Sequence, residues 1–297
     1  MFEGSIVALV TPFRNGRIDH DALTALVEKQ VAGGTSALVA CGTTGEAPTL
    51  SEHEQAEVIA TVVKASRGRV PVVAGTGTYD TAETIRRTQA AAAAGCRGAM
   101  VVTPYYNKPT VRGLEAHFTA VADASPVPLI IYNIPGRTGT RIPPALIAKL
   151  ARHPRVAALK DATGSPADCM DVAELCELTI LAGDDALTLP WMALGAKGIV
   201  SVAGNVVPEE IAALVREASR GDYVAARRRH YRLLPLFKAL FVESNPIPVK
   251  AALALQGIGT PEVRLPLVAA EESTCELLKK ALAGLAAPAA SSARGAG

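Results

Sequence analysis

The sequence predicts an α/β fold, a closed (β/α)8 TIM barrel with a C-terminal helical appendage. Eight short apolar runs alternate with helical patterns over about the first 220 residues. The runs are continuous, as is typical of parallel strands buried on both faces. Eight such units predict a closed barrel rather than an open sheet. The apolar runs are Ile6–Val10, Ala37–Ala40, Val70–Ala74, Ala99–Val102, Leu129–Tyr132, Val156–Leu159, Thr179–Ala182 and Gly198–Val202.

Helix signals lie between the apolar runs. Ser51 opens an S-x-x-E capping box, which marks the start of the second helix. Pro144, Pro166 and Pro208 stand where the first turn of a helix tolerates proline. The first helix follows Asp19 and has an apolar stripe at i, i+3, i+4 and i+8. This stripe consists of Leu23, Leu26, Val27 and Val31.

We divide the chain into a barrel of residues 1–221 and a C-terminal helical domain of residues 222–297. The second part shows no strand signal. Its patterns predict helices over Tyr223–Phe241, Pro248–Gln256 and Glu271–Leu285. The last twelve residues are small and polar, and we expect a frayed tail there.

The composition argues against several classes of protein. The formal net charge is only +2, from 30 basic and 28 acidic residues, so we expect no nucleic-acid and no membrane partner. No apolar run is long enough for a membrane span or a signal peptide, and we therefore expect a cytoplasmic protein. The five cysteines form no CxxC pair, which predicts reduced and mostly structural thiols.

Lys160 is the most informative candidate for chemistry. It directly follows the apolar run Val156–Leu159, and a (β/α)8 barrel has its active site at the C-terminal ends of the strands. A poorly solvated pocket there favours the neutral amine, which can attack a ketone and form an imine. Taken alone, a lysine that merely extends to solvent is the better interpretation. Tyrosines and threonines at neighbouring strand ends reverse this preference.

Other strand ends carry polar groups that fit a small keto acid. Tyr132 can relay the protons that imine formation requires, or it only plugs the top of the barrel. Thr43 and Thr44 supply hydroxyls and backbone N–H groups in a glycine-flanked turn, which suits a carboxylate but also describes a plain turn. Arg137 offers a planar fork for a second carboxylate, or it is a surface-loop arginine.

The segments that come close to known metal-binding and cofactor-binding motifs lack residues that those motifs require. The segment His53–Glu57 is not H-E-x-x-H, and we expect His53 to face solvent. Gly75–Thr78 lacks the third glycine and the acidic partner of a dinucleotide site. Asp184-Asp185 could bind a cation, but the cap of the next helix explains this pair better. With no His cluster near a strand end, a zinc site is disfavoured, and we predict no metal and no cofactor.

Six segments match one family in combination. They are Gly42-Thr43-Thr44-Gly45-Glu46, Pro104-Tyr105-Tyr106-Asn107-Lys108-Pro109, Tyr132-Asn133-Ile134-Pro135-Gly136-Arg137-Thr138-Gly139, Leu159-Lys160-Asp161-Ala162-Thr163-Gly164, Gly183-Asp184-Asp185 and Asn245-Pro246-Ile247-Pro248-Val249-Lys250. With these segments the sequence resembles the dihydrodipicolinate synthases (4-hydroxy-tetrahydrodipicolinate synthases), of the pyruvate-dependent class I aldolase and N-acetylneuraminate lyase superfamily. The resemblance extends from the first strand to about Leu267.

The resemblance implies four catalytic residues. Lys160 would carry the pyruvate Schiff base, and Tyr132 would be the general acid and base. Thr43 would link Tyr132 to Tyr106 in a proton relay. In this family Tyr106 reaches into the site of the neighbouring subunit, so the resemblance implies a homotetramer built as a dimer of dimers.

Four further residues would bind the substrates. The resemblance implies that Thr44 holds the pyruvate carboxylate and Arg137 the carboxylate of the second substrate, L-aspartate 4-semialdehyde. Gly183 and Val200 would line the pyruvate pocket. The implied reaction is a lyase-class condensation to 4-hydroxy-tetrahydrodipicolinate, in diaminopimelate and lysine biosynthesis, without a cofactor.

Two alternatives stay open. N-acetylneuraminate lyase and the keto-sugar-acid aldolases share the lysine and the tyrosine, but they usually lack an arginine at the position of Arg137. A catalytically inactive barrel that senses carboxylates would bind pyruvate without a reducible adduct. The complete set of relay residues disfavours this second alternative.

Feedback inhibition by L-lysine is expected to be weak or absent. Lysine-inhibited relatives use polar groups around the second and third βα units, and Glu83 and Tyr105 match them. Other positions differ from the sensitive enzymes, namely Ala47, Pro48, Glu52, Gln55 and Tyr79.

Overall fold

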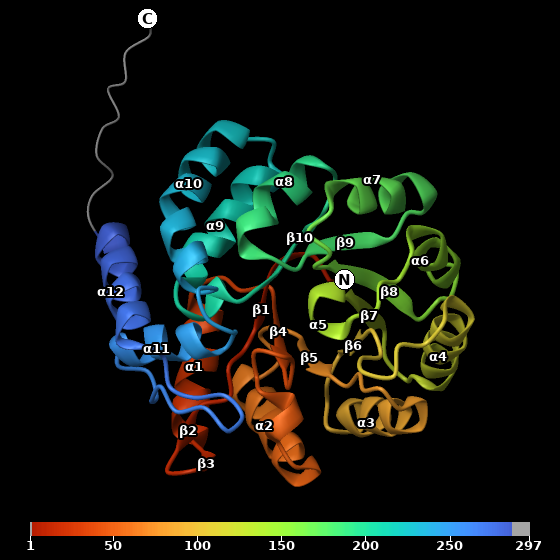
Figure 1. Ribbon diagram of the computed structural model, residues 1–297, viewed down its shortest axis with the longest axis horizontal. Coiled ribbons are helices and arrows are strands. Elements are labelled where there is room, and N and C mark those ends of the chain that lie inside the picture. The colour runs from red at the N-terminus through yellow and green to blue at the C-terminus, as the bar shows by residue number, and fades with distance from the viewer. Residues whose placement is uncertain (1, 287–297) are drawn as a thin grey trace, which may run out of the picture.

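The structure, a computed structural model, describes residues 2–286. Among these residues, eight parallel strands form a closed barrel, in which each strand also neighbours the next one along the chain. Helices surround the barrel (Figure 1). The predicted (β/α)8 barrel is therefore confirmed. Its strands are β1 (Gly4–Ala8), β4 (Ala37–Ala40), β5 (Val72–Gly75), β6 (Gly98–Val102), β7 (Leu129–Asn133), β8 (Val156–Asp161), β9 (Thr179–Ala182) and β10 (Gly198–Ser201).

The helices begin where the sequence signals predict. Ser51 and Glu54 form the predicted capping box of α2, and the Asp19 carboxylate accepts a hydrogen bond from the N–H of Ala22 at the start of α1. The α-helices of residues 2–286 are α1 (His20–Ala32), α2 (Glu52–Ser66), α3 (Thr81–Ala93), α4 (Val111–Ala124), α5 (Pro135–Thr138), α6 (Pro144–Leu150), α7 (Pro166–Leu175), α8 (Thr188–Ala193), α9 (Pro208–Ser219), α10 (Tyr223–Ala239), α11 (Ile247–Leu255) and α12 (Glu272–Ala286). Short 3-10 helices are η1 (Ala47–Thr49), η2 (Asp185–Leu187) and η3 (Ala203–Asn205).

A small hairpin that periodicity does not predict stands outside the barrel. It pairs β2 (Phe13–Arg14) with β3 (Arg17–Ile18) in antiparallel fashion. Asn15 and Gly16 connect the two strands, with positive φ angles of 53° and 78°. Asn-Gly is the dipeptide that such two-residue turns favour, whereas strands of two residues are too short to show alternation.

The barrel interior has its own apolar layer. Phe2 is 1 % exposed and lies at the N-terminal end of the barrel, next to Gly98. A Cβ atom at Gly98 would come within 2.5 Å of the Phe2 ring, so glycine is required there. Higher in the barrel, Ile130 and Ala158 belong to the inner layer. Because side chains alternate along a strand, the residues two positions further along β7 and β8 also point inward.

β8 extends beyond its apolar run. The run ends at Leu159, but the strand continues to Asp161 because Tyr132 pairs with Lys160 and Asn133 pairs with Asp161 on β7. The polar ends of these two strands therefore belong to the sheet rather than to loops. The pairing of the two strands fixes the backbone positions of these residues.

The C-terminal segment packs against one side of the barrel. α10 contacts α9, and α12 contacts both α10 and α11 (Figure 1). Its three helices confirm the predicted ones to within two residues at each end. The predicted tail lies outside the described residues, apart from Ala286, which ends α12. The division at residues 221 and 222 remains a proposal. Within residues 2–286, no helix is both long and apolar enough to cross a membrane.

Candidate active site

Lys160 and Tyr132 lie side by side inside the barrel. They are paired across β7 and β8, and Lys160 Nζ lies 4.0 Å from the centre of the Tyr132 ring. Both point inward because they follow Ala158 and Ile130 by two residues along their strands. Each is only 4 % exposed. The structure thus brings together the two residues to which the resemblance assigns the central chemistry.

Burial lowers the pKa of Lys160 from its ordinary value of 10.5 to about 7. Desolvation is the main cause, because a buried ammonium loses its hydration. The Asp185 carboxylate raises this pKa again, and the Arg137 guanidinium lowers it. A pKa near neutrality leaves a large fraction of the amine unprotonated and able to attack a carbonyl.

Tyr132 has the opposite shift. Burial raises the pKa of its phenol to about 12, while the charge of Arg137 and a hydrogen bond with Thr43 lower it. The phenol is therefore protonated at neutral pH and can donate a proton. Its backbone is also fixed, because the Tyr132 carbonyl accepts hydrogen bonds from the N–H of Thr103 at 2.9 Å and the Thr103 hydroxyl at 3.0 Å.

Thr43 and Thr44 lie in a tight loop that follows β4. Cys41 and Glu46, at the two ends of this loop, both have a left-handed φ of 54°. Thr43 lines the cavity described below. Thr44 is 3 % exposed, and its hydroxyl accepts a hydrogen bond from Asn245 Nδ2 at 3.0 Å. The loop therefore presents one hydroxyl to the cavity and holds the other in contact with the C-terminal segment.

Arg137 stands at the mouth of the barrel, on the short helix α5. Its side chain is exposed, and Nη2 donates a hydrogen bond to the Asn245 carbonyl at 3.2 Å. Asn245 thus contacts both Arg137 and Thr44, which are 108 and 201 residues away in sequence. Sequence reasoning gave Asn245 no role of its own. The only sequence evidence for a function of Asn245 was its position in the matched Asn245–Lys250 segment.

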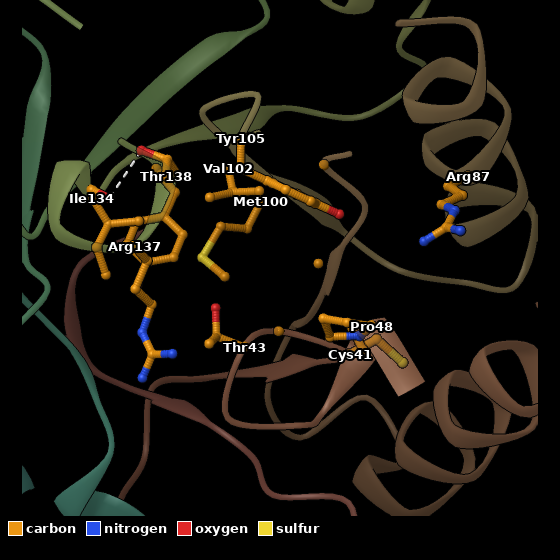
Figure 2. A pocket seen from close by; sticks show the side chains of 15 residues that line it. Cys41, Thr43, Pro48, Arg87, Met100, Val102, Tyr105, Ile134, Arg137 and Thr138 are labelled. Atoms are coloured by element: carbon orange, nitrogen blue, oxygen red, sulfur yellow. Dashed lines mark hydrogen bonds between the residues drawn. The ribbon is translucent and has the colours of Figure 1, made fainter. Parts of the chain in front are cut away.

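Gly183 directly follows β9, and Val200 lies on β10. A Cβ at Gly183 would lie 2.7 Å from Ala162 Cβ and 2.9 Å from the Asp161 carbonyl, so glycine permits a close approach of two backbones. Val200 is 1 % exposed and belongs to the same inner layer as Tyr132. Neither residue is among those that line the cavity of Figure 2 within the described chain.

The Asp184-Asp185 pair has two separate functions. Asp184 caps η2 by accepting a hydrogen bond from the N–H of Ala186 at 2.9 Å, which confirms the capping prediction for this residue. The prediction is wrong for Asp185, which is 1 % exposed and accepts hydrogen bonds from the Ser201 hydroxyl and from the N–H groups of Val202 and Ala203. Desolvation raises the pKa of Asp185, and these donors act against that shift. Sequence reasoning therefore missed the carboxylate that acts on Lys160.

A cavity of about 220 Å³ opens at the C-terminal ends of the strands, with Thr43, Tyr132 and Arg137 in its wall. Figure 2 shows the Thr43 hydroxyl and the Tyr105 side chain pointing into the space between Arg137 and Arg87. A water molecule occupies about 30 Å³ in the liquid, so the cavity has room for a small organic acid. Lys160 and Thr44 are not among its lining residues within the described chain.

Cys41 also contributes to the cavity wall. Its side chain is 2 % exposed, and burial raises the pKa of the thiol to about 12. A protonated, buried thiol is a poor nucleophile, which supports packing as its role.

Tyr106 does not enter this cavity. Its side chain is 89 % exposed, and its φ of 70° lies in the left-handed region. The preceding residue, Tyr105, packs edge-on against Tyr79 with ring centres 5.3 Å apart. The structure therefore does not bring Tyr106 to Thr43 and Tyr132 of its own chain, and the predicted contribution to a neighbouring subunit stays a prediction.

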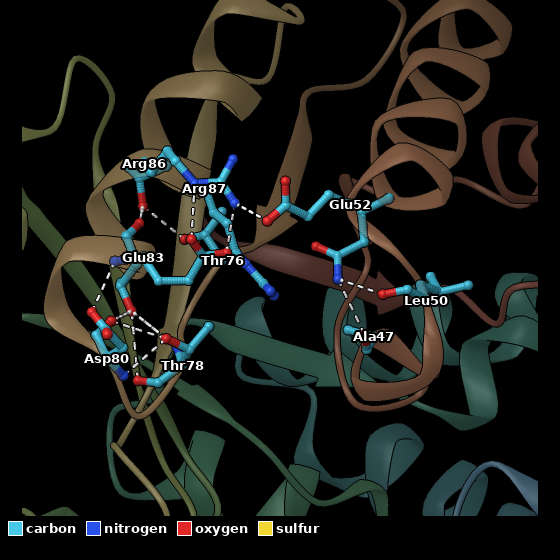
Figure 3. Close-up of polar contacts among 12 residues, drawn as sticks. Ala47, Leu50, Glu52, Thr76, Thr78, Asp80, Glu83, Arg86 and Arg87 are labelled. Atoms are coloured by element: carbon cyan, nitrogen blue, oxygen red, sulfur yellow. Dashed lines mark hydrogen bonds and ion pairs between the residues drawn. The ribbon is translucent and has the colours of Figure 1, made fainter. Parts of the chain in front are cut away.

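A group of charged side chains lies beside the cavity, between α2 and α3 (Figure 3). Glu83 accepts hydrogen bonds from Arg86 and Arg87, and Arg86 also bonds to Glu52. Arg86 first and Arg87 second hold the pKa of Glu83 below its usual range. The carboxylate that matches lysine-inhibited relatives is thus already paired with two guanidinium groups of its own chain.

No three His, Cys, Asp or Glu side chains of residues 2–286 are placed so that they could hold a metal ion. His53 faces solvent as predicted, with 84 % of its side chain exposed.

The match to known proteins covers nearly the whole chain. A model of the dihydrodipicolinate synthetase family matches residues 1–285. The chain belongs to this family. One relative is the 4-hydroxy-tetrahydrodipicolinate synthase of Geotalea uraniireducens (strain Rf4), which is 50 % identical over 275 residues, or 92 % of this chain and 95 % of the relative. The resemblance inferred from the six segments is confirmed.

Solved structures of the dihydrodipicolinate synthetase family have the same fold. The dihydrodipicolinate synthase of Aquifex aeolicus is 47 % identical, with a TM-score of 0.93 over 95 % of this chain and 97 % of that one. The enzyme of Cyanidioschyzon merolae, solved with lysine bound, is 38 % identical, with a TM-score of 0.92 over 95 % of this chain and 98 % of that one.

Proposed function

We propose that this chain condenses pyruvate with L-aspartate 4-semialdehyde to give 4-hydroxy-tetrahydrodipicolinate, a lyase reaction of diaminopimelate and lysine biosynthesis. The observation that carries the proposal is the buried Lys160, with a pKa of about 7, beside a protonated Tyr132. Relatives that are about 50 % identical are 4-hydroxy-tetrahydrodipicolinate synthases. Site and family thus support the same chemistry.

Lys160 provides the nucleophile. Its neutral amine attacks the ketone carbon of pyruvate, a C–N bond forms, and water leaves to give the Schiff base. Loss of a methyl proton then produces an enamine, with the protonated imine nitrogen accepting the electron pair. The enamine carbon attacks the aldehyde of the second substrate and forms the C–C bond. The amine of that substrate finally displaces Lys160 as the ring closes.

Tyr132 moves the protons of these steps. Its phenol is protonated at neutral pH and lies against the Lys160 amine, so it can protonate the oxygen that leaves as water. Thr43 lines the same cavity, lowers the pKa of the Tyr132 phenol and continues the relay. We assign its outer end to Tyr106 of the partner subunit, because the side chain of this residue is exposed and does not line the cavity of its own chain.

The carboxylates of the two substrates bind to different residues. Thr44, in its glycine-flanked turn, holds the pyruvate carboxylate, and Gly183 and Val200 surround the pyruvate carbons. Arg137 binds the carboxylate of L-aspartate 4-semialdehyde, because its guanidinium is exposed at the mouth where a second substrate arrives. Asn245 supports both groups through its contacts with Thr44 and Arg137.

The proposed assembly is a homotetramer made of two dimers. A site completed by Tyr106 of the partner subunit requires at least a dimer. We also propose a cytoplasmic location, because all five cysteines of the chain are free and free thiols are typical of reducing compartments.

Trapping with borohydride tests this function. The protein is treated with pyruvate and borohydride, with and without L-aspartate 4-semialdehyde, and its intact mass is measured. Lys160→Ala is the test variant. Lys108→Ala is a matched control, because Lys108 is an exposed lysine close to the same mouth. A Cβ atom at Gly139, where α5 ends, would lie 3.3 Å from Lys108 Cε.

We expect one reduced pyruvate adduct in the wild type and in Lys108→Ala, none in Lys160→Ala, and depletion of the adduct by the aldehyde. An adduct that the aldehyde leaves unchanged would instead indicate a keto-sugar-acid aldolase or an N-acetylneuraminate lyase. A wild type that binds pyruvate without any adduct would refute the Schiff-base mechanism.

A further inference from the structure

A buried ion pair connects the Thr43–Thr44 loop to the C-terminal segment. Lys250 Nζ lies 2.6 Å from Glu46 Oε1, and both side chains are 1 % exposed. The other carboxylate oxygen of Glu46 accepts a hydrogen bond from the backbone N–H of Arg264 at 3.0 Å. Glu46 belongs to the loop, and both of these partners belong to the C-terminal segment. The carboxylate therefore ties the two together at two points.

The loop has a conformation that needs support from its surroundings. Cys41 and Glu46 both have a φ of 54°, which costs free energy for residues other than glycine. Inside the loop, the N–H of Gly45 donates to the Gly42 carbonyl and the N–H of Glu46 donates to the Thr43 carbonyl, both at 3.1 Å. These short turns shape the loop but do not fix it relative to the rest of the barrel. The Thr11 hydroxyl, which donates to the Gly45 carbonyl at 2.7 Å, holds the loop to the segment after β1, and the Glu46 side chain holds it to the C-terminal segment.

Asn245 makes a second connection just before α11. Its Nδ2 donates to the Thr44 hydroxyl at 3.0 Å, and its carbonyl accepts from Arg137 at 3.2 Å. The N–H of Lys250 donates to the Pro246 carbonyl at 3.1 Å, in the first turn of α11. The start of α11 therefore places Asn245 and Lys250 against the same loop.

Stability is not a sufficient reason for the Glu46–Lys250 pair. Removing both charges from water costs about as much as their attraction returns, and apolar residues of similar volume are often equally stable. Lys250 already has an apolar neighbour, because its Nζ lies 4.1 Å from the centre of the Phe13 ring. An ion pair adds a defined geometry to such contacts, because a carboxylate and an ammonium at 2.6 Å fix each other's position.

We propose that Glu46 and Lys250 are positioning residues of the active site, through which the C-terminal segment sets the position of Thr43 and Thr44. This inference rests on the proposed role of Thr44 in binding the pyruvate carboxylate. Both side chains are 1 % exposed, and their polar contacts join the loop to the C-terminal segment, so both act through the loop. A misplacement of about 1 Å can lower catalytic efficiency about 100-fold.

The test removes both charges at once, in Glu46→Gln/Lys250→Met. The amide oxygen at position 46 can still accept the hydrogen bond of Arg264, and the thioether at position 250 keeps the contact with Phe13. The measurements are the pyruvate concentration for half-maximal borohydride trapping, kcat, KM and Tm. Phe118→Leu is the control, because it truncates a fully buried side chain on α4 and leaves the loop intact.

We expect the double variant to need at least about tenfold more pyruvate for half-maximal trapping, with KM rising more than kcat falls. Phe118→Leu should keep the wild-type KM and kcat, even where its Tm falls as far as that of the double variant. Half-maximal trapping at the wild-type concentration in the double variant overturns the inference, because the loop then keeps its place without the pair. A wild type that forms no adduct overturns the proposed function, and this inference with it.

Glu46→Gln alone is the second variant if the double variant does not fold. Burial lowers the pKa of Lys250, and the Glu46 carboxylate raises it. With the carboxylate gone, the amine can lose its proton and be buried without charge. We expect the same increase in the half-saturating pyruvate concentration, and a wild-type value in this variant also overturns the inference.

Discussion

The protonation of Lys160 determines how fast a pyruvate adduct can form at each pH. The amine has a pKa of about 7, against an ordinary value of 10.5. At pH 8, about 90 % of amines with the lower pKa are unprotonated, compared with about 0.3 % of amines with the ordinary pKa. The site therefore offers roughly 300-fold more nucleophile at this pH than an exposed lysine would.

Single-turnover trapping at pyruvate concentrations far below saturation measures this effect, because the pH profile then reports the free enzyme. Between about pH 5.5 and 9.5 we expect one sigmoidal increase with a midpoint near 7 and a plateau above about pH 8.5. In Arg137→Ala the midpoint should move upward, because the guanidinium lowers the pKa of Lys160. The shift should be a fraction of a pH unit, since this charge is exposed and screened.

A rate that increases in proportion to hydroxide up to about pH 9.5 would refute the reasoning, because it would show that Lys160 has the pKa of a solvated lysine. A midpoint that moves downward in Arg137→Ala would show that another group titrates.

Arg137→Ala should lower kcat/KM for L-aspartate 4-semialdehyde by about 100-fold or more and leave the trapped pyruvate adduct largely intact; equal losses would contradict its role in binding the second carboxylate. Lys160→Met should raise the free energy of unfolding at pH 7 by up to about 4 kcal/mol, because the folded protein holds the amine at a pKa of about 7 while the unfolded chain binds a proton up to 10.5. This gain should shrink as the pH rises from 7 towards 10.5 in chemical denaturation experiments, and a less stable methionine variant would disprove it. L-lysine should inhibit weakly or not at all, because Glu83 is already paired with Arg86 and Arg87. A sub-millimolar inhibition constant in a coupled assay would refute this expectation.

The barrel and the inner pair of residues could be predicted because they depend on local patterns. Continuous apolar runs indicate parallel strands, and strict alternation along a strand then places Lys160 and Tyr132 on the same inner face. The capping box of α2 is equally local, since Ser51 and Glu54 bond to each other. Each of these features needs only a few neighbouring residues.

Other parts of the site depend on contacts that no local pattern contains. Asn245 meets Thr44 across 201 residues, and Lys250 meets Glu46 across 204. In the sequence, Lys250 is an ordinary lysine in an apolar helix, and only the fold shows that it is buried. Asp184 and Asp185 are adjacent and chemically identical, so their sequence could not tell the cap from the carboxylate that acts on Lys160.

With its proposed role in binding the second carboxylate, Arg137 would connect the reactivity of the site with the order in which substrates bind. While its guanidinium is free, its charge lowers the pKa of both Lys160 and Tyr132. A carboxylate bound to Arg137 would neutralise this charge and raise the pKa of Lys160, which would reduce the fraction of nucleophilic amine. The lysine is therefore most reactive towards pyruvate before the second substrate arrives. Once the imine has formed, the Lys160 nitrogen no longer needs a low pKa, and a protonated imine is the better electron sink. Under the proposed assignment, the same arginine would thus favour pyruvate first and the aldehyde second.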